Sequence, residues 1–160
     1  MEAIKRFIKA HQLLGANLGE QSRRFPLCSY SHLTASNSYA YAVDLDRPVS
    51  LTVFTCMKKA GYSTAIIRAY DPSGSGRFDV NAVSNIRNAN QAGLGTEVFM
   101  TPSPRSSKKG SQQFKELYEG LKNGKINVKT VWLQVTSPIN WGSNSKENIY
   151  FLNDIITMAN

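Results

Sequence analysis

The chain has 160 residues, of which 41% are hydrophobic, 10% aromatic and 19% charged, the composition of an ordinary globular domain. Its length suits one domain, and no apolar run reaches the roughly 18 residues that a membrane-spanning helix needs. The net charge of +8 is spread along the chain, with +3 in residues 1–40 and +5 in residues 41–160. Such a diffuse positive field favours anionic partners, although a soluble basic surface is its simplest interpretation.

The cysteines and histidines give no metal-binding pattern. Cys28 and Cys56 permit one internal disulfide, which sequence alone cannot establish. Cys56 falls in an expected helix, SLTVFTCMKKAG, where a buried free thiol is the default. His11 and His32 both lie before the expected domain, and no C-x-x-C motif occurs. We therefore predict no metal site and no cofactor.

Residues 1–38 read as a leader that precedes the folded domain. A secretory signal needs an uninterrupted apolar core of about 7–15 residues, whereas MEAIKRFIKAHQLLGANLG is broken by Lys9, His11 and Gln12. The segment is typical of a short amphipathic basic helix or a loosely ordered terminus. No signal peptide is evident, so the sequence leaves the localisation open.

From residue 39 the pattern alternates strands and helices four times. Apolar runs predict strands at 39–45, 63–70, 96–101 and 128–135. A helix is expected after each strand, and the last spans 145–159. The expected caps are Ser50, Asp79 and Ser145 at N-termini and Gly61 and Gly124 at C-termini. The residues expected to pack on the sheet are Val83, Ile86 and Ala89, then Phe114, Leu117, Tyr118 and Leu121, then Ile149, Leu152, Ile155 and Ile156.

Repeated strand–helix units with short connections predict an α/β fold with a parallel sheet and right-handed crossovers. The SGSG run at 73–76 follows a strand, where a phosphate could be cradled. It lacks the third glycine of G-x-G-x-x-G and the Lys-Ser/Thr of a Walker A loop, so we predict a flexible loop there.

The stretch 131–141, VWLQVTSPINW, is an apolar strand that ends in polar residues and a Pro-containing loop. It resembles the family-25 glycoside hydrolases, and most closely their nematode-type lysozyme-like members. In active members this strand carries an Asp-x-Glu pair at its C-terminal end, and Gln134 and Thr136 occupy the matching positions here. Glycoside hydrolysis normally needs two carboxyl groups that flank the bond. The resemblance therefore implies the family's fold and argues against the family's chemistry.

The resemblance runs over residues 39–160. The family fold is an irregular α/β barrel that is longer than this stretch. We therefore expect a partial (β/α) barrel of four units with two open sheet edges, which invite self-association. The resemblance also implies a secreted or lysosomal protein that acts on peptidoglycan in defence against bacteria.

The first strand supplies the best remaining catalytic candidate. Asp44 in YAVDLD matches the family's first-strand aspartate, which the resemblance places at the sugar-binding groove. Asp46 points to the same side, because side chains two residues apart share a strand face. One of the two acids could instead cap a loop.

Three other residues are candidates for binding substrate. Tyr70 and Asp71 end the second strand, and Trp141 follows the fourth. Tyr70 and Trp141 could stack on a sugar or pack on the sheet end, and Asp71 could pair with Asp44 as a glycosidase pair. Trp132 favours core packing. Glu97 lies near the start of its strand, the wrong end for chemistry.

Three functions remain open. The preferred one is a catalytically degenerate lysozyme-like protein that binds bacterial glycan. The second is an active muramidase that uses Asp44 with Asp71 or a partner chain. The third is a basic module that binds nucleic acid or protein. Aromatic residues are not interleaved with Lys and Arg as in a nucleic-acid platform, which argues against this third function.

Overall fold

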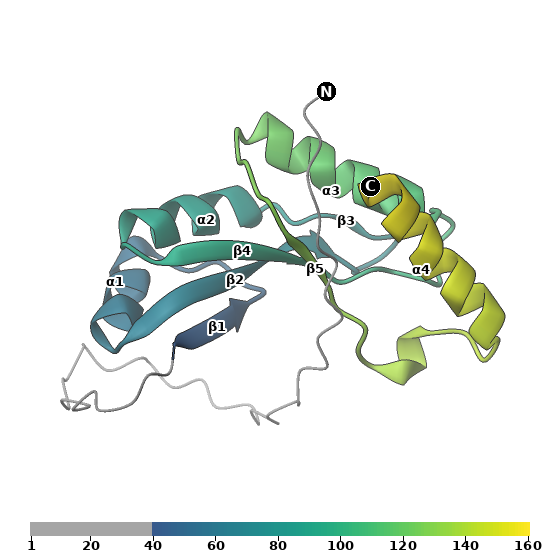
Figure 1. Cartoon of the computed structure of the whole chain (residues 1–160), viewed down its shortest axis with the longest axis horizontal. Helices are drawn as coiled ribbons and strands as arrows, with labels where there is room; N and C mark the ends of the chain where they lie inside the picture. Colours follow the sequence, from purple (N-terminus) through teal and green to yellow (C-terminus); the bar gives the residue numbers. More distant parts are fainter. Residues whose placement is uncertain (1–39) are drawn as a thin grey trace.

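The structure is a computed structural model that describes residues 40–160 (Figure 1). The predicted leader, with its histidines and Cys28, lies outside these residues. In chain order the elements are β1 (Tyr41–Leu45), α1 (Leu51–Lys59), β2 (Tyr62–Asp71), β3 (Arg77–Phe78), α2 (Ala82–Gln91), β4 (Gly95–Met100), α3 (Gly110–Asn123), β5 (Val131–Leu133), the 3₁₀ turn η1 (Pro138–Asn140) and α4 (Ser145–Ala159).

The predicted α/β fold with a parallel sheet is confirmed. Strands β1, β2, β4 and β5 are parallel neighbours in that order, and the short β3 pairs antiparallel with β2. Parallel strands need crossover connections, and the helices between them supply these. The sequence analysis missed β3, which lies in the segment read as a loop, and predicted β5 too long. Among the described strands, β1 and β5 are the edges of the sheet. Self-association through these edges stays a prediction, which analytical sedimentation can test.

The two faces of the sheet differ in chemistry. One face packs under α1, α2 and α3 through Ala65, Ile67, Val98, Met100 and Leu133, all buried in one core. Because side chains alternate along a strand, the residues between these lie on the opposite side. We call that side the inner face. Its members are Asp44, Ile66, Arg68, Glu97, Phe99, Trp132 and Gln134.

A β-bulge interrupts this alternation in β2. The register with β4 shifts between Arg68 and Tyr70, and both Ala69 and Tyr70 are fully buried. An extra residue in one strand reverses which face the following side chains meet. Tyr70 therefore leaves the inner face and joins the core beneath α3.

The first two helices begin differently from each other. Ser50 caps α1 as predicted, with its side chain accepting a hydrogen bond from the Val53 N–H at 3.4 Å. The prediction of Asp79 as the cap of α2 is wrong, because the helix begins at Ala82 and Asn81 is the cap residue. Asp79 instead accepts a hydrogen bond from the Asn81 N–H at 2.9 Å and fixes the turn before the helix.

Helices α3 and α4 correct three further predictions. Phe114, Leu117 and Leu121 are buried as predicted, but Tyr118 is 37% exposed because it lies at the margin of the apolar stripe. Helix α4 is capped by Asn144 and not by Ser145. The helix buries Ile155 and leaves Ile149 55% exposed, because it packs on α3 rather than on the sheet.

Helix α4 completes the N-terminus of α3. Lys109, the cap residue of α3, offers no side-chain hydrogen bond. Asp154 of α4 supplies it across the interface, where its Oδ2 accepts from the Ser111 N–H at 2.7 Å. The close approach depends on Gly110, since an added Cβ would lie 2.5 Å from the Phe151 carbonyl oxygen. The hydrogen bonds from Ser111 lower the pKa of Asp154.

Cys56 corrects the prediction of a buried free thiol. The residue is half-buried and is disulfide-bonded. A disulfide requires two Cα atoms within about 7 Å, which is a property of the tertiary structure that sequence spacing does not reveal.

We predict that Asp154→Ala lowers the free energy of unfolding at pH 7 by about 1 kcal/mol, the usual cost of losing a helix cap. The pKa of Asp154 is lowered by folding. Its stabilising contribution is therefore present above the unfolded pKa of about 3.9 and is lost as the pH falls through the folded pKa.

Urea unfolding at neutral and acidic pH measures this difference. The exposed neighbour on the same helix, Asn153→Ala, is the matched control and should change stability little at either pH. If Asp154→Ala lowered the free energy of unfolding by the same amount down to strongly acidic pH, the charge of Asp154 would not be what stabilises the helix end.

Candidate functional site

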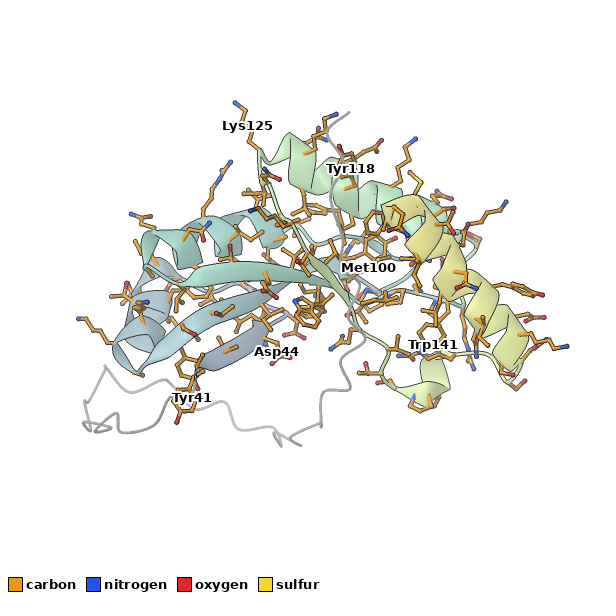
Figure 2. The ribbon with its side chains drawn as sticks, viewed as in Figure 1. Tyr41, Asp44, Met100, Tyr118, Lys125 and Trp141 are labelled. Carbon is orange, nitrogen blue, oxygen red and sulfur yellow. The ribbon has the colours of Figure 1, made fainter. Side chains whose placement is uncertain are left out.

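The candidate site is the rim where β1, β2, β4 and β5 end on the inner face. In parallel α/β sheets, the loops at the carboxyl ends of strands carry functional groups. Figure 2 shows Asp44 at the end of β1 and Trp141 beneath α4, both on the side of the sheet away from α2 and α3. The other rim residues are Asp46, Arg68, Asp71, Thr101, Gln134 and Thr136.

Asp44 is an exposed carboxylate. It lies opposite Ile66 in the register of β1 with β2, and Ile66 lies opposite Glu97 of β4. Among the described residues, Asp44 has no hydrogen-bond or ion-pair partner. Its carboxylate is therefore exposed to solvent, and its place in a sugar-binding groove stays a prediction.

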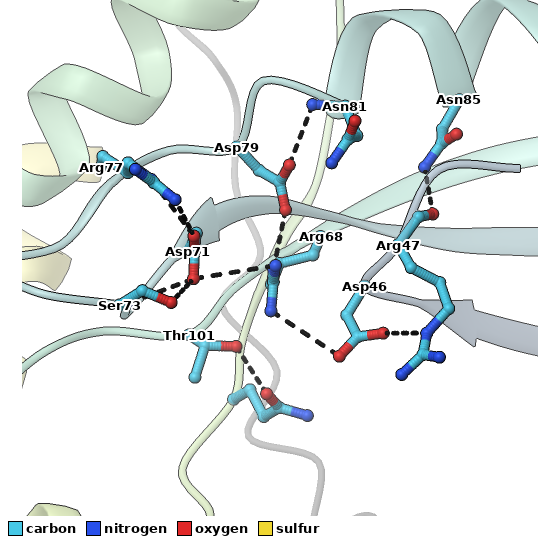
Figure 3. A network of polar contacts seen from close by, with 11 residues as sticks. Asp46, Arg47, Arg68, Asp71, Ser73, Arg77, Asp79, Asn81, Asn85 and Thr101 are labelled. Carbon is cyan, nitrogen blue, oxygen red and sulfur yellow. Dashed lines mark hydrogen bonds and ion pairs between the residues drawn. The ribbon is translucent and has the colours of Figure 1, made fainter.

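Arg68 is the centre of the polar network at the rim (Figure 3). Its Nε donates to Asp79 Oδ2 at 2.8 Å, and Asp79 is only 4% exposed. Its Nη1 and Nη2 each lie 3.7 Å from a carboxylate oxygen, of Asp46 and of Asp71 respectively. These acids belong to the loop after β1, the end of β2 and the segment before α2. One guanidinium therefore holds three parts of the rim together.

Asp46 is the most open member of this network. Its carboxylate is 55% exposed and also lies 3.4 Å from Arg47 Nε. Exposed pairs of this kind contribute about 0–1 kcal/mol, because water screens them and side-chain entropy opposes them. The Asp46 carboxylate can therefore turn toward a ligand at small cost, and Asp44 lies two residues before it, in β1.

Asp71 is occupied within the protein and is only 7% exposed. Its Oδ1 accepts from the Ser73 hydroxyl at 2.6 Å, and its Oδ2 accepts from Arg77 Nη2 at 3.2 Å. Burial alone would raise its pKa, but the hydrogen bonds from Ser73 and the charges of Arg68 and Arg77 outweigh burial and lower the pKa.

The register also separates Asp71 from Asp44. Asp44 is level with Ile66 of β2, and Asp71 lies five residues further along that strand. Because the bulge makes Ala69 an extra residue, these five residues advance four steps of the register, and at about 3.3 Å per step the two positions are roughly 13 Å apart along the strands. A glycosidase pair requires carboxyl groups about 5–10 Å apart, so this geometry disfavours the pairing that the sequence left open.

Tyr70 serves packing in this structure. The ring is fully buried, and its hydroxyl donates to Glu116 Oε2 at 2.9 Å. Lys108 donates to the same carboxylate oxygen at 2.8 Å. Burial, reinforced by the Glu116 carboxylate, raises the pKa of Tyr70. A buried ring leaves no surface on which a sugar can stack. Of the two roles that the sequence allowed for Tyr70, this favours packing. No sequence signal predicts the bulge that turns Tyr70 away from the inner face and into the core.

Gln134 and Thr136 occupy the end of β5 without any ionisable group. The Gln134 N–H donates to the Met100 carbonyl at 2.9 Å, which extends the pairing of β5 with β4 by one residue. Its side-chain Oε1 accepts from the Thr101 hydroxyl at 2.6 Å. The carbonyl of Thr136 accepts from Trp141 Nε1 at 3.3 Å. The end of this strand thus presents amide and hydroxyl groups, which hydrogen-bond but transfer no proton near neutral pH.

Trp141 closes the loop that follows β5. Its indole is half-buried and meets the Phe151 ring edge-on with centroids 6.1 Å apart. Arg105 donates to its carbonyl at 3.0 Å, so the loop after β4 is joined to the loop after β5. The contact with Phe151 supports the packing role, and stacking on a sugar stays a prediction.

The sequence analysis missed one inner-face pair. Trp132 Nε1 donates to the Glu97 carboxylate across β4 and β5, and both residues are half-buried. Side chains alternate along β4, so with Val98 and Met100 in the core, Glu97 is expected on the inner face. This alternation was the sequence signal for the pair. Over residues 40–160 no group of three or more His, Cys, Asp or Glu side chains could hold a metal ion. No helix in that range is long and apolar enough to cross a membrane.

Comparison with known proteins decides the family. A family model described as lysozyme-like protein 1 matches residues 35–160. The chain belongs to this family of lysozyme-like proteins. It is 49% identical over 122 residues to lysozyme-like protein 1 of Caenorhabditis elegans, covering 76% of this chain and 41% of that protein. The resemblance to family-25 glycoside hydrolases is thereby confirmed.

Two further relatives support the assignment. Lysozyme-like protein 7 of Caenorhabditis elegans is 47% identical over 76% of this chain and 43% of its own length. The probable GH family 25 lysozyme 2 of Dictyostelium discoideum is 34% identical over 81% of this chain and 60% of its own length. The chain thus spans less than half the length of these two nematode lysozyme-like proteins.

One solved structure shares the fold. The modular autolysin LytC from Streptococcus pneumoniae, solved with a synthetic peptidoglycan ligand, superposes with a TM-score of 0.54 at 16% identity. The match covers 72% of this chain and 29% of that chain. At this identity the likeness concerns the fold, and it confirms that the four parallel strands and their helices resemble part of the LytC barrel.

We predict that Arg68→Gln lowers the free energy of unfolding by about 3 kcal/mol, because it leaves the buried Asp79 carboxylate without its cation. Adding Asp79→Asn removes the orphaned charge and should recover part of that loss. Urea unfolding of the two variants and the wild type measures both effects. Equal stability of the single and double variants would show that the pair is not the stabilising element.

Proposed function

We propose that this chain is a catalytically degenerate lysozyme-like protein that binds the glycan of bacterial peptidoglycan at the rim of its sheet. The observation that supports the proposal is the absence of a carboxylate just after β5, where Gln134 and Thr136 occupy the positions that the resemblance assigns to the family's acid pair. The amide of Gln134 is bound to Thr101 and has no titratable proton.

The remaining carboxylates do not replace that pair. Hydrolysis of a glycosidic bond needs one carboxylic acid to protonate the leaving oxygen and one carboxylate on the other side of the sugar. Asp44 is accessible, but Asp71 is buried and hydrogen-bonded to Ser73 and Arg77. Asp46 follows β1 two residues after Asp44, and two acids on one side of a bond cannot act from both sides.

The rim retains what glycan binding requires. Asp44 and Asp46 offer exposed acceptors, and Gln134 has an amide group. Trp141 lies in the loop beside them, where part of its indole is accessible for stacking on a sugar ring. The peptidoglycan ligand of LytC makes the same polymer the first candidate here. By family resemblance, such binding would serve defence against bacteria.

We expect the folded chain to leave a suspension of purified peptidoglycan unclarified, and Asp44→Asn to leave that background unchanged. The physical reason is that the accessible acids of the rim, Asp44 and Asp46, come from one segment, whereas hydrolysis needs carboxyl groups on both sides of the bond. Circular dichroism first confirms that both proteins are folded, and the fall in turbidity measures lysis.

Lysis by the wild type that is lost in Asp44→Asn would establish an active muramidase and overturn the degenerate assignment. The matched control is Glu147→Gln, which removes an exposed carboxylate on α4 away from the sheet. Lysis that is equal in all three proteins would point to a contaminating enzyme rather than to this chain.

We predict that Trp141→Ala weakens retention on insoluble peptidoglycan by about fivefold to tenfold, since stacking of an aromatic ring contributes on the order of 1 kcal/mol. The control Tyr150→Ala removes an aromatic ring that is 71% exposed on α4, remote from the rim, and should bind like the wild type. Co-sedimentation over a range of peptidoglycan concentrations gives both affinities. An unchanged affinity of Trp141→Ala would exclude the rim as the glycan site.

A further inference from the structure

The loop between β4 and α3, residues 101–109, brings a cation to the candidate site. It reads TPSPRSSKK and contains Arg105, Lys108, Lys109 and no acid. Arg105 at its centre is exposed, and its Nη2 donates to the Trp141 carbonyl at 3.0 Å. The guanidinium therefore lies beside the residue whose indole we propose as the platform for a sugar ring. Figure 2 shows that residue beneath α4, on the side of the sheet away from α2 and α3.

A buried side chain holds this loop in place. Gln113 of α3 is fully buried, and its Oε1 accepts from the Ser103 N–H at 2.9 Å. Its Nε2 donates to the Ser103 carbonyl at 2.9 Å and also lies 3.2 Å from the Ser106 hydroxyl oxygen and from the Lys108 carbonyl. These contacts fix the backbone on both sides of Arg105. Less conformational entropy is therefore lost when the side chain of Arg105 meets a ligand.

The charge of Arg105 has no counter-ion among residues 40–160. The residue takes part in none of the ion pairs of that range, whereas Lys108 of the same loop pairs with Glu116 at 2.8 Å. One of the five N–H donors of the guanidinium binds the Trp141 carbonyl, and the other four have no acceptor within the described part of the chain. A guanidinium with free donors matches a carboxylate, which can accept two parallel N–H bonds from it.

The exposed acids of the rim lie on the other side from Arg105. Asp44 belongs to β1 and Asp46 follows it, whereas Arg105 follows β4, and β2 lies between these two strands. At about 4.8 Å between neighbouring strands, β1 and β4 are roughly 10 Å apart. A ligand that spans the rim therefore meets acceptors at one end and a cation at the other. A carboxylate on such a ligand is attracted to Arg105 and repelled by the two acids.

We propose that Arg105 is a specificity residue of the glycan site and binds a carboxylate of the polymer whose sugar ring stacks on Trp141. This inference rests on the proposed function and narrows its ligand to a carboxylated glycan. In peptidoglycan that group is supplied by the stem peptides or, where the peptide has been removed, by the lactyl group of muramic acid. Chitin is built from similar β-1,4-linked N-acetylated rings and has no carboxylate. Arg105 therefore distinguishes between two polymers whose sugar rings would stack alike.

The experiment measures retention of the full chain on intact peptidoglycan, on peptidoglycan stripped of its peptides by an amidase, and on chitin. The test variant is Arg105→Gln, which removes the charge. The matched control is Arg87→Gln, because Arg87 is also exposed and its Nη2 also donates to a backbone carbonyl, that of Gly124, at 3.0 Å. Gly124 ends α3 where the strands begin, so the control removes the same charge away from the rim. Near-ultraviolet circular dichroism confirms that the aromatic rings keep their wild-type environment in both variants.

We expect Arg105→Gln to bind intact peptidoglycan about fivefold more weakly than the wild type, the range of one exposed contact between opposite charges. The same variant should bind chitin like the wild type, since chitin offers no carboxylate to lose. Arg87→Gln should match the wild type on all three polymers. A loss confined to intact peptidoglycan assigns the carboxylate to the stem peptide, and a loss that persists on the stripped polymer assigns it to the lactyl group.

Equal losses of Arg105→Gln on peptidoglycan and on chitin would overturn the proposal, because Arg105 would then act only by holding the Trp141 loop. Unchanged binding of Arg105→Gln to peptidoglycan that retains the wild type would also overturn it and would leave the proposed function standing. If neither polymer retained the wild type, the proposed function itself would fail, and the carboxylate site with it.

Discussion

The buried ion pair between Arg68 and Asp79 is the interaction on which the rim depends. Arg68 stands on the inner face of the central strand β2, where no described helix covers the sheet. A charged group in that position needs a fixed partner, and Asp79 supplies it at 2.8 Å. Because the remaining guanidinium nitrogens face Asp46 and Asp71, the same residue orders the loops from which a ligand would be bound. Stability and site geometry are therefore coupled at one side chain.

The rim shows how the fold accommodates a neutral residue directly after β5. The helix-side core, from Ala65 and Ile67 to Val98 and Met100, depends on apolar burial alone and does not require catalytic acids. Directly after β5, the side-chain oxygen of Gln134 accepts a hydrogen bond from the Thr101 hydroxyl, and no buried side-chain nitrogen or oxygen of the described residues lacks a partner. A neutral residue at this position therefore destabilises the fold little. Replacing an acid there by a neutral residue would remove a group that can donate or accept a proton in hydrolysis.

The two ends of the sheet differ in how their charges are arranged. Around Arg68 at the rim, carboxylates and guanidinium groups neutralise one another over short distances, so polar ligands meet directed hydrogen bonds and little net field. At the opposite end, where the strands begin, basic side chains outnumber acidic ones, among them Lys122, Lys125 and Lys129.

Sequence periodicity determined the order of strands and helices, since a buried strand and an amphipathic helix each require their own spacing of apolar residues. It also placed Asp44, Gln134 and Trp141 at strand ends. What it missed depends on packing between distant segments. The bulge after Arg68 turned Tyr70 into the core, and α4 packed on α3, so Asp154 became a cap and Ile149 stayed exposed. The partners of Asp71 and Asp79, and the bond to Cys56, likewise depend on which side chains the fold brings within a few ångströms. Local sequence fixes what each segment can form, and only the tertiary structure decides which groups meet.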